Sequence, residues 1–306
     1  MEIFNLEPVL ERLDREKPWV RQLESTLELV AERWSLERIV PFENLSFNFV
    51  AQALRLGGSS VVLKVGNPNA LESEMDALIH YGGNGCVGLL ESNRQWGAFL
   101  LEHIRPGTML SSVQDEDEAV SIACAVMNKI HKPPPEQHSF PTLERHVSAL
   151  LKYPRNQNTA DPIPRDLLER ARTQALELLA TQAAPVVLHG DLHHFNILKD
   201  AHRGWTAIDP KGLVGERAFE VGPFFYNPYP DIFEHPDLER VLLRRLDVFS
   251  ETLGSDARDR RELDRERLRQ WAFVQAVLLA CWGVEYGALE WLEGPLKVAR
   301  VLSRLR

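Results

Sequence analysis

The chain has 306 residues, of which 44% are hydrophobic and 26% charged, a composition that excludes a disordered or fibrous protein. Its length exceeds the roughly 250–300 residues at which single hydrophobic cores usually divide, so we expect two packed lobes. The formal net charge of −9 and the pI of about 5.6 argue against a nucleic-acid partner and favour a small cationic ligand.

Several features favour a cytoplasmic location. The first residues lack the basic start and the apolar stretch of a signal peptide. The longest apolar segment, residues 271–284, is shorter than the about 20 residues that a membrane-spanning helix needs, so it predicts a buried helix and no membrane partner. Three widely spaced cysteines fit reduced thiols better than a disulfide framework. Nothing in the sequence indicates an oligomeric state.

The N-terminal part of the chain predicts a small antiparallel sheet. A helical pattern at 7–34 is followed by expected strands at 38–40, 47–56 and 60–65, a helix at 70–81, and strands at 87–91 and 96–102. Lys64 interrupts the apolar strand 60–65, as expected of an ammonium that reaches from a sheet toward the α- and β-phosphates of ATP. The alternative is a lysine whose side chain reaches water from a sheet edge.

The segment before Lys64 departs from the protein-kinase pattern. Residues 42–50 contain no glycine-rich motif. A loop over the phosphates would therefore have to use Asn44 and Ser46 instead.

Beyond Pro106 and Gly107 the chain predicts mainly helices. Ser112 and Asp115 are spaced as a capping box, and the acidic residues 115–118 would interact favourably with the dipole at that helix's N-terminus. Further helices are expected at 143–151, 165–181, 238–253 and 263–305, the last with breaks near its glycines. The charged run 255–269 predicts a solvated helix face.

Residues 187–211 carry the strongest functional signal. The run 187–198 reads VLHGDLHHFNIL, and 207–211 reads AIDPK. Asp191, Asn196 and Asp209 each stand beside an apolar run typical of a buried strand. Asn196 follows Asp191 by five residues, the interval of kinase catalytic loops, which lets one loop present a base to a hydroxyl and an amide oxygen to Mg²⁺.

These side chains predict phosphoryl transfer from Mg-ATP to a hydroxyl. That reaction requires a protein to hold the metals, align the acceptor and accept its proton. We assign proton acceptance to Asp191 and metal binding to Asn196 and Asp209. His189 and His193 are expected to orient the loop; His193 stands where protein kinases carry a lysine, so the loop itself has no fixed cation.

The same segment leaves one other chemistry open. His189, Asp191, His193 and His194 lie within six residues, and imidazole with carboxylate is also a metal-ligand set. A zinc-dependent hydrolase is therefore an alternative. It would need further ligands downstream, where the remaining histidines lack surrounding strand signals.

The runs HGDLHHFN (189–196) and IDPKGLVGE (208–216) resemble the aminoglycoside phosphotransferase superfamily, in particular its streptomycin phosphotransferase and hydroxyurea phosphotransferase branch. The resemblance covers nearly the whole chain. It implies an α+β, protein-kinase-like fold, with a small antiparallel-sheet N-terminal lobe that ends in a hinge (1–104) and a larger, mainly helical C-terminal lobe (105–306).

The resemblance also implies the reaction partners. The cofactors would be ATP and Mg²⁺, and the acceptor a small molecule, first of all an aminoglycoside of the streptomycin type. The alternative is a housekeeping kinase for another small alcohol, amine or N-hydroxy compound such as hydroxyurea.

Individual contacts follow from the same resemblance. Glu74, with Glu72 as second choice, would pair with Lys64. The backbone carbonyl of Glu102 and the N–H of Ile104 would bind adenine. The side chains lining the adenine pocket would be Leu100 and Leu101.

The acceptor side of the site is also inferred by resemblance. Carboxylates of the C-terminal helices and loops would hold a cationic acceptor through charge-assisted hydrogen bonds. The candidates are Asp231, Glu234, Glu285, Glu290 and Glu293. Tyr226 and Trp282 would form walls, and Glu216 and Glu220, which follow Asp209 in the chain, would brace the loop.

Overall fold

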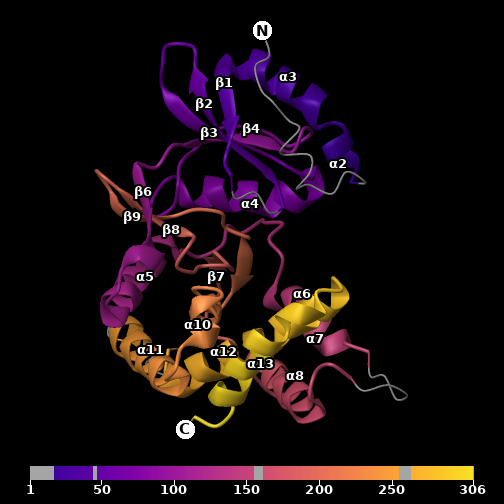
Figure 1. The fold of residues 1–306 in the computed structure, drawn as a ribbon, viewed down its shortest axis with the longest axis vertical. Helices are drawn as coiled ribbons and strands as arrows, with labels where there is room; N and C mark the ends of the chain where they lie inside the picture. The colour runs from indigo at the N-terminus through magenta and orange to yellow at the C-terminus, as the bar shows by residue number, and fades with distance from the viewer. Residues whose placement is uncertain (1–16, 44–46, 155–160, 255–262, 306) are drawn as a thin grey trace. The chain divides into compact units, whose positions relative to one another are not determined.

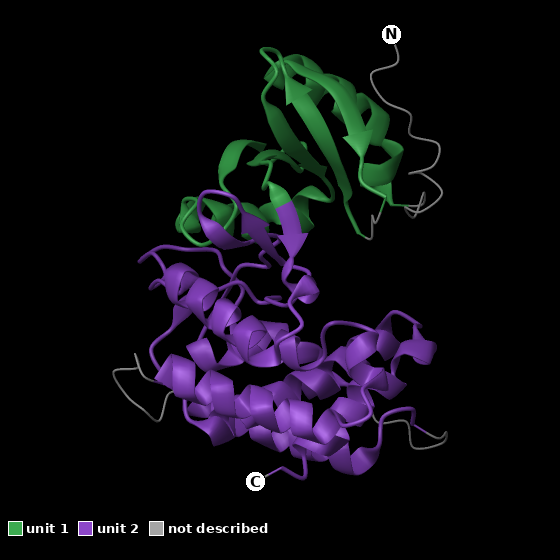
Figure 2. Cartoon of the chain, turned by 60° about the vertical axis from the view of Figure 1, so that its left-hand side comes forward, with its two compact units in different colours: residues 1–106 green, residues 107–306 purple. Residues whose placement is uncertain are grey.

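The computed structural model describes residues 17–43, 47–154, 161–254 and 263–305, and Figure 1 labels its elements. The chain divides into two compact units, residues 1–106 (unit 1) and 107–306 (unit 2), which are green and purple in Figure 2. The division lies two residues from the expected boundary at 104/105. Unit 1 is built on a sheet and unit 2 is mainly helical, the α+β arrangement that the sequence predicts.

Unit 1 contains a five-stranded antiparallel sheet in the order β1-β2-β3-β5-β4. The strands are β1 (Leu36–Pro41), β2 (Phe49–Arg55), β3 (Ser60–Val65), β4 (Leu89–Asn93) and β5 (Ala98–Glu102). The helices are α2 (Pro18–Arg21), α3 (Leu23–Trp34) and α4 (Pro68–Tyr81). Helix α4 begins two residues before its predicted start, because Asn67 caps it by accepting a hydrogen bond from the Asn69 N–H at 3.1 Å.

The core of unit 1 lies between α3 and the sheet. Leu23, Leu27, Val30 and Trp34 recur at helical spacing, so that α3 buries one face. They pack with inward-facing strand residues such as Phe49. Burying a side chain of this size stabilises the fold by roughly 1.5–3 kcal/mol. Strand β3, which carries Lys64, therefore packs into this core through Val61, Leu63 and Val65.

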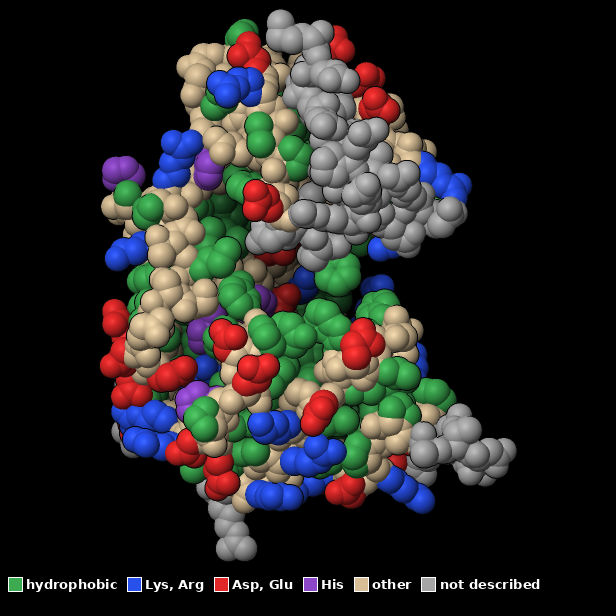
Figure 3. Space-filling view, in the orientation of Figure 1, with side chains coloured by type: hydrophobic (Ala, Val, Ile, Leu, Met, Phe, Trp, Pro, Cys, Tyr) green, Lys and Arg blue, Asp and Glu red, His purple; other side chains and the backbone are tan. Residues whose placement is uncertain are grey.

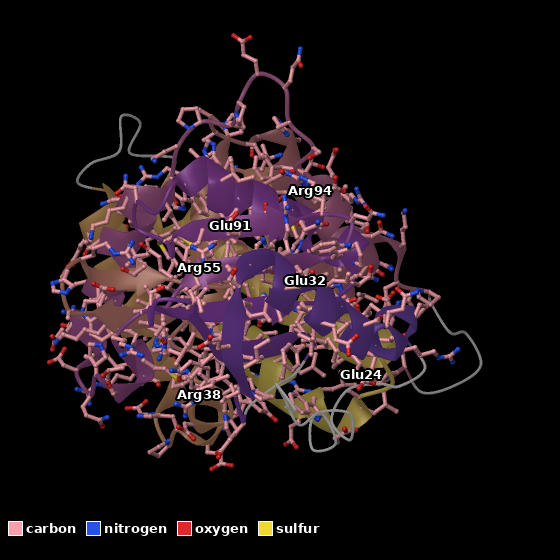
Figure 4. The ribbon with its side chains drawn as sticks, turned by 90° about the horizontal axis from the view of Figure 1, so that it is seen from above. Glu24, Glu32, Arg38, Arg55, Glu91 and Arg94 are labelled. Carbon is pink, nitrogen blue, oxygen red and sulfur yellow. The ribbon has the colours of Figure 1, made fainter. Side chains whose placement is uncertain are left out.

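Exposed ion pairs lie on the surface of unit 1. Arg55 and Glu91, both labelled in Figure 4, form an ion pair at 2.7 Å. Arg94, also labelled there, pairs with Asp76 and lies 3.9 Å from Glu72. An open hollow of about 630 Å³ beside Arg55 and Glu91 is lined by residues of α3, β2 and β4. Glu72 is thus directed toward an exposed arginine.

Unit 2 combines short strands with long helices. Its two small sheets have the orders β6-β8-β9 and β10-β7. The strands are β6 (Pro106–Met109), β7 (Val186–Leu188), β8 (Ile197–Asp200), β9 (Gly204–Ala207) and β10 (Leu213–Gly215). The α-helices are α5 (Glu116–Ile130), α6 (Leu143–His146), α7 (Ser148–Lys152), α8 (Arg165–Ala180), α9 (Gly222–Phe225), α10 (Asp231–Glu234), α11 (Leu238–Gly254), α12 (Arg265–Glu285) and α13 (Glu293–Leu302). Three 3-10 helices complete the unit: η1 (Leu110–Ser112), η2 (Arg217–Val221) and η3 (Leu289–Trp291).

Helix α12 forms the centre of unit 2. It packs against α8, α9, α11 and α13. Its residues 271–278 are all buried, as predicted for the longest apolar segment. A helix that is buried on every side needs apolar residues all round. In the described part of the chain, no helix is both long and apolar enough to cross a membrane.

Two details of the predicted helices were wrong. The N-cap of α5 is Asp115, which accepts from the Glu118 N–H at 2.9 Å, whereas the Ser112 hydroxyl donates to the Met109 carbonyl at 2.8 Å. The capping box therefore does not form. In the charged run 255–269, of which 263–269 are described, Arg269 is buried and donates to the Leu302 carbonyl at 2.7 Å instead of facing water.

Candidate active site

Two antiparallel ladders bring the loop 189–196 and the segment 208–212 together in unit 2. Leu188 of β7 pairs with Leu213 of β10, and Ile197 of β8 pairs with Ala207 of β9. Loop 189–196 connects β7 to β8, and segment 208–212 connects β9 to β10. The residues that flank one connection are therefore paired with the residues that flank the other, so the two connections lie side by side. The N–H of Ile208 donates to the Asn196 carbonyl at 2.9 Å.

His189 ties Asp191 to this arrangement. Its ring is buried, with Nε2 2.8 Å from the Ile208 carbonyl and Nδ1 accepting the Asp191 N–H at 3.2 Å. Burial lowers the pKa of His189, so the ring is neutral, with one donating and one accepting nitrogen. His189 therefore makes the contacts of a residue that orients the loop.

Asn196 and Asp209 present oxygen atoms suited to a hard cation. The Asn196 Nδ2 donates to the Asp191 carbonyl at 2.9 Å and lies 3.2 Å from Nε2 of His193, so the loop engages the amide nitrogen and not Oδ1. Asp209 has a φ of 65°, a left-handed conformation uncommon outside glycine and concentrated at functional sites. Mg²⁺ favours one or two carboxylates together with water and phosphate oxygens. The donor set fits that ion.

Two nitrogen-bearing side chains flank the Asp191 carboxylate. His193 Nε2 lies 3.6 Å from Oδ1, and Lys211 Nζ lies 3.4 Å from Oδ2. Burial lowers the pKa of His193, although the charge of Asp191 acts in the opposite direction. The Asp191 side chain is 30% exposed, so its carboxylate can meet a hydroxyl from solution.

Glu220 binds the first two residues of loop 189–196 through their backbone N–H groups. The fully buried carboxylate accepts the N–H groups of His189 at 2.6 Å and Gly190 at 2.8 Å, and it lies 3.2 Å from Nε2 of His131. Burial alone would raise the pKa of Glu220, but the hydrogen bond with His131, the charge of His131 and the N–H of Gly190 hold it below its usual value. Gly190 has a φ of 79°, and a Cβ there would lie 2.8 Å from the Leu213 side chain, so the turn requires glycine.

We expect Glu220→Gln to lower the free energy of unfolding by about 1–3 kcal/mol, because the new NH₂ group would leave one backbone N–H of the loop without an acceptor. Urea unfolding of the variant measures this loss. The exposed Glu177→Gln on α8 is the matched control and should leave the free energy unchanged within about 0.5 kcal/mol. Equal stability of Glu220→Gln and wild type would show that Glu220 does not hold the loop.

Glu216 braces a different part of the unit. Its buried carboxylate accepts from the Arg267 guanidinium at 2.7 and 2.8 Å, from the Trp271 indole, and from the Ala183 N–H at 3.3 Å. These contacts connect the end of β10 to α12. Arg267 therefore pairs with a buried carboxylate, a second departure from the predicted solvated run.

In unit 1, Lys64 and Glu74 form a buried ion pair. The Lys64 Nζ lies 2.7 and 2.8 Å from the two carboxylate oxygens, and the side chains are 3% and 9% exposed. Glu74 and not the exposed Glu72 is therefore the carboxylate that meets this lysine. That the pair serves ATP stays a prediction.

The expected hinge residues are largely buried. Leu100, Leu101 and Ile104 belong to the core of unit 1. The Glu102 N–H donates to the Gly88 carbonyl at 3.0 Å, and its carboxylate accepts the Gly88 N–H at 2.9 Å. Their contacts with adenine remain predictions. The loop candidates Asn44 and Ser46 lie outside the described residues.

The five candidate acceptor carboxylates are all exposed and belong to elements that pack together. They lie on α10, at the end of α12, in η3 and at the start of α13, and α10 contacts α13 while η3 contacts α12 and α13. Over this region Figure 3 shows acidic side chains among hydrophobic ones. Tyr229 stacks on Trp291 at 4.9 Å, and Tyr286 is 80% exposed. The five carboxylates are Asp231, Glu234, Glu285, Glu290 and Glu293.

Of the two expected walls, Trp282 lies in the last turn of α12, three residues before Glu285, and that either residue lines an acceptor site stays a prediction. Trp282 makes an edge contact with His146 at 5.1 Å. Burial and the charges of Asp191 and Glu220 raise the pKa of Tyr226 well above its usual value. His146 carried no signal in the sequence because its neighbours are distant along the chain.

The histidines do not form a zinc site. His194 packs on Phe224 with ring centroids 3.8 Å apart, and neither of its ring nitrogens has a hydrogen-bond partner. Among the residues that the structure describes, no group of three or more His, Cys, Asp or Glu side chains is arranged to hold a metal. The zinc-hydrolase alternative has no support here.

Comparisons with known proteins identify the family of the chain. Residues 33–287 match the family described as aminoglycoside/hydroxyurea antibiotic resistance kinase. The chain is 29% identical over 292 residues to streptomycin 6-kinase of Streptomyces griseus, covering 94% of this chain and 92% of that protein. It is 30% identical over 275 residues to hydroxyurea phosphotransferase of Kitasatospora aureofaciens, covering 89% and 76%.

Solved structures confirm the kinase-like α+β fold. Choline kinase LicA from Streptococcus pneumoniae superposes with a TM-score of 0.62 at 11% identity, over 93% of this chain and all of that chain. Amicoumacin kinase hAmiN gives 0.65 at 13% identity, over 93% and 96%. With the family match extending over most of its length, the chain belongs to the aminoglycoside/hydroxyurea antibiotic resistance kinases.

Proposed function

We propose that the protein transfers the γ-phosphoryl group of Mg-ATP to a hydroxyl of a small molecule, with an aminoglycoside of the streptomycin type as the leading acceptor. The observation that carries the proposal is the pairing of loop 189–196 with segment 208–212, which gathers Asp191, Asn196 and Asp209 in one part of unit 2. The similarity to streptomycin 6-kinase supports the acceptor class.

Each side chain has a defined task in this proposal. Asp191 accepts the proton of the acceptor hydroxyl as that oxygen attacks phosphorus. Asn196 and Asp209 hold Mg²⁺, which supplies positive charge against the phosphate oxygens when bound. Lys64, kept in place by Glu74, binds the α- and β-phosphates. The exposed carboxylates of the α10 to α13 region attract the cationic acceptor.

An N-hydroxy acceptor is the second candidate. The chain is 30% identical to hydroxyurea phosphotransferase, and the same base and metal ligands would serve an N-hydroxyl group. We place either reaction in the cytoplasm, where the buried thiols of Cys86, Cys124 and Cys281 stay reduced.

The test is a panel of acceptors incubated with purified protein and γ-labelled ATP. Streptomycin, hydroxyurea, choline and a simple amino alcohol are compared by kcat/KM, and mass spectrometry identifies the phosphorylated product. We expect streptomycin to react fastest. Preference for hydroxyurea would favour the second candidate, and absence of transfer to every acceptor would contradict a small-molecule kinase of either kind.

Ligand binding gives a separate prediction. Mg-ATP at about 100 times its Kd should stabilise the folded protein by about 2.7 kcal/mol through mass action, which raises Tm. Chelating the metal with EDTA should remove most of that increase, because the phosphates would then lack their counter-charge. Thermal unfolding without nucleotide, with ATP, with Mg-ATP and with Mg-ATP plus EDTA measures the effect. Identical Tm values in all conditions would argue against a nucleotide site.

A further inference from the structure

Lys211 is held beside Asp191 by both its backbone and its side chain. The Lys211 N–H donates to the His189 carbonyl at 2.7 Å, and the Gly212 N–H reaches the same oxygen at 3.3 Å. The Lys211 Nζ lies 3.4 Å from Asp191 Oδ2, and the side chain is 51% exposed. The backbone contact fixes the origin of the side chain beside Asp191, and about half of the side chain remains accessible to a ligand.

Two histidines, His193 and His146, also lie within electrostatic range of Asp191. Burial lowers the pKa of His193, which lies 3.6 Å from Asp191 Oδ1. Burial also lowers the pKa of His146 to about 4, with Asp191 opposing and Lys211 adding to the shift. Among the described residues, the ion pairs of Asp191 are those with His193 and Lys211. Of these two partners, Lys211 is the one whose side chain ordinarily carries a positive charge at neutral pH.

Phosphoryl transfer is favoured by a positive charge close to the phosphoryl group that is transferred. An acceptor hydroxyl within about 2.6–3.2 Å of Asp191 can give up its proton, and its oxygen must approach phosphorus to about 3–3.5 Å. Negative charge is then spread over the equatorial oxygens of the transferred group. An ammonium 3.4 Å from the base lies within reach of those oxygens.

We propose that the Lys211 ammonium contacts the transferred phosphoryl group and offsets its charge in the transition state. The inference rests on the proposed function. In the step, the bond from acceptor oxygen to phosphorus forms while the bond from phosphorus to the β,γ-bridging oxygen breaks. The electron pair of the broken bond leaves with ADP, the hydroxyl proton passes to Asp191, and Lys211 keeps its protons.

Lys211→Met tests the charge, and Lys199→Met, which removes an exposed lysine of β8, is the matched control. We expect Lys211→Met to lower kcat by about 10²–10³-fold, the range for loss of one transition-state donor. Its calorimetric Kd for Mg-ATP should stay within about threefold of wild type, whereas its affinity for Mg-ADP with aluminium fluoride and acceptor should fall by a factor similar to kcat. The control should match wild type in all three measurements.

A second variant restores the charge without restoring lysine. Lys211→Cys, alkylated with bromoethylamine, carries an ammonium on a chain of nearly the same length. The native Cys86, Cys124 and Cys281 are buried, and burial raises the pKa of Cys124 and Cys281 to about 12, so the reagent favours the introduced thiol. Alkylation should recover at least tenfold of the lost kcat, which a purely structural role would not predict.

Three results would overturn the inference: kcat of Lys211→Met within about threefold of wild type, a loss confined to the Kd for Mg-ATP, or no recovery in a folded, alkylated Lys211→Cys protein. The wild-type reaction in the same assay separates this failure from that of the proposed function. If wild type transfers phosphate and Lys211→Met does so equally, only the role of Lys211 is refuted. If wild type transfers to no acceptor, the proposed function is refuted together with the role of Lys211.

Discussion

Asp191→Asn should lower kcat by about 10²–10⁴-fold, the usual contribution of a positioned general base, while the Kd for Mg-ATP changes by less than about threefold. The substitution keeps the size of the side chain. It also keeps the loop, because Asp191 is held through its backbone: its N–H donates to His189 and its carbonyl accepts from Asn196. The change therefore removes the proton acceptor without removing the contacts that place it.

Steady-state kinetics with the best acceptor, together with calorimetry for Mg-ATP, measures both quantities. Asp166→Asn, an exposed aspartate in the first turn of α8, is the matched control and should retain wild-type kcat. Retention of full activity by Asp191→Asn would remove Asp191 from the mechanism. A loss that appears only in the Kd would instead make it a binding residue.

Lys64→Met should lower the free energy of unfolding by about 3–5 kcal/mol, because it leaves the Glu74 carboxylate buried without its counter-charge. The two Nζ to oxygen distances of 2.7 and 2.8 Å and the near-complete burial of both side chains make this pair different from a surface ion pair. The double variant Lys64→Met with Glu74→Leu should recover most of the loss, since an apolar pair of similar volume needs no charge compensation.

Urea unfolding of the single and double variants gives these free energies. The ion pair of Arg55 and Glu91 in the same sheet is the matched control: its side chains are 31% and 45% exposed, and replacing them by Met and Leu should cost about 0–1 kcal/mol. Both Lys64 variants should bind Mg-ATP weakly, because the phosphate partner is missing in each. A Lys64→Met protein as stable as wild type would contradict the buried pair, and wild-type affinity for Mg-ATP would contradict its proposed use.

The sequence predicted the parts of the fold that depend on local pattern. The apolar run at 60–65 became β3, and the helical periodicity at 70–81 became α4 with its start two residues earlier. The spacing of Asp191 and Asn196, with strands on either side, predicted a loop between β7 and β8. In each case hydrophobic periodicity and turn residues act over a few positions, so a short window contains the necessary information.

Contacts between distant residues could not be predicted in this way. His131 and Glu220 are 89 residues apart, and neither stands in a pattern that indicates a partner. Arg267 lies in a charged run that is typical of a solvated helix, yet its side chain binds the buried Glu216, 51 residues away. The left-handed backbone conformation of Asp209 could not be predicted from the sequence either, because local preference disfavours it and only the surrounding structure imposes it.

A crystal structure with Mg²⁺ and a non-hydrolysable ATP analogue tests the central claim most directly. The account predicts a metal ion about 2.0–2.1 Å from Oδ1 of Asn196 and from a carboxylate oxygen of Asp209, with the terminal phosphate facing Asp191. A nucleotide whose metal is held by other residues, or that binds away from loop 189–196, would contradict it.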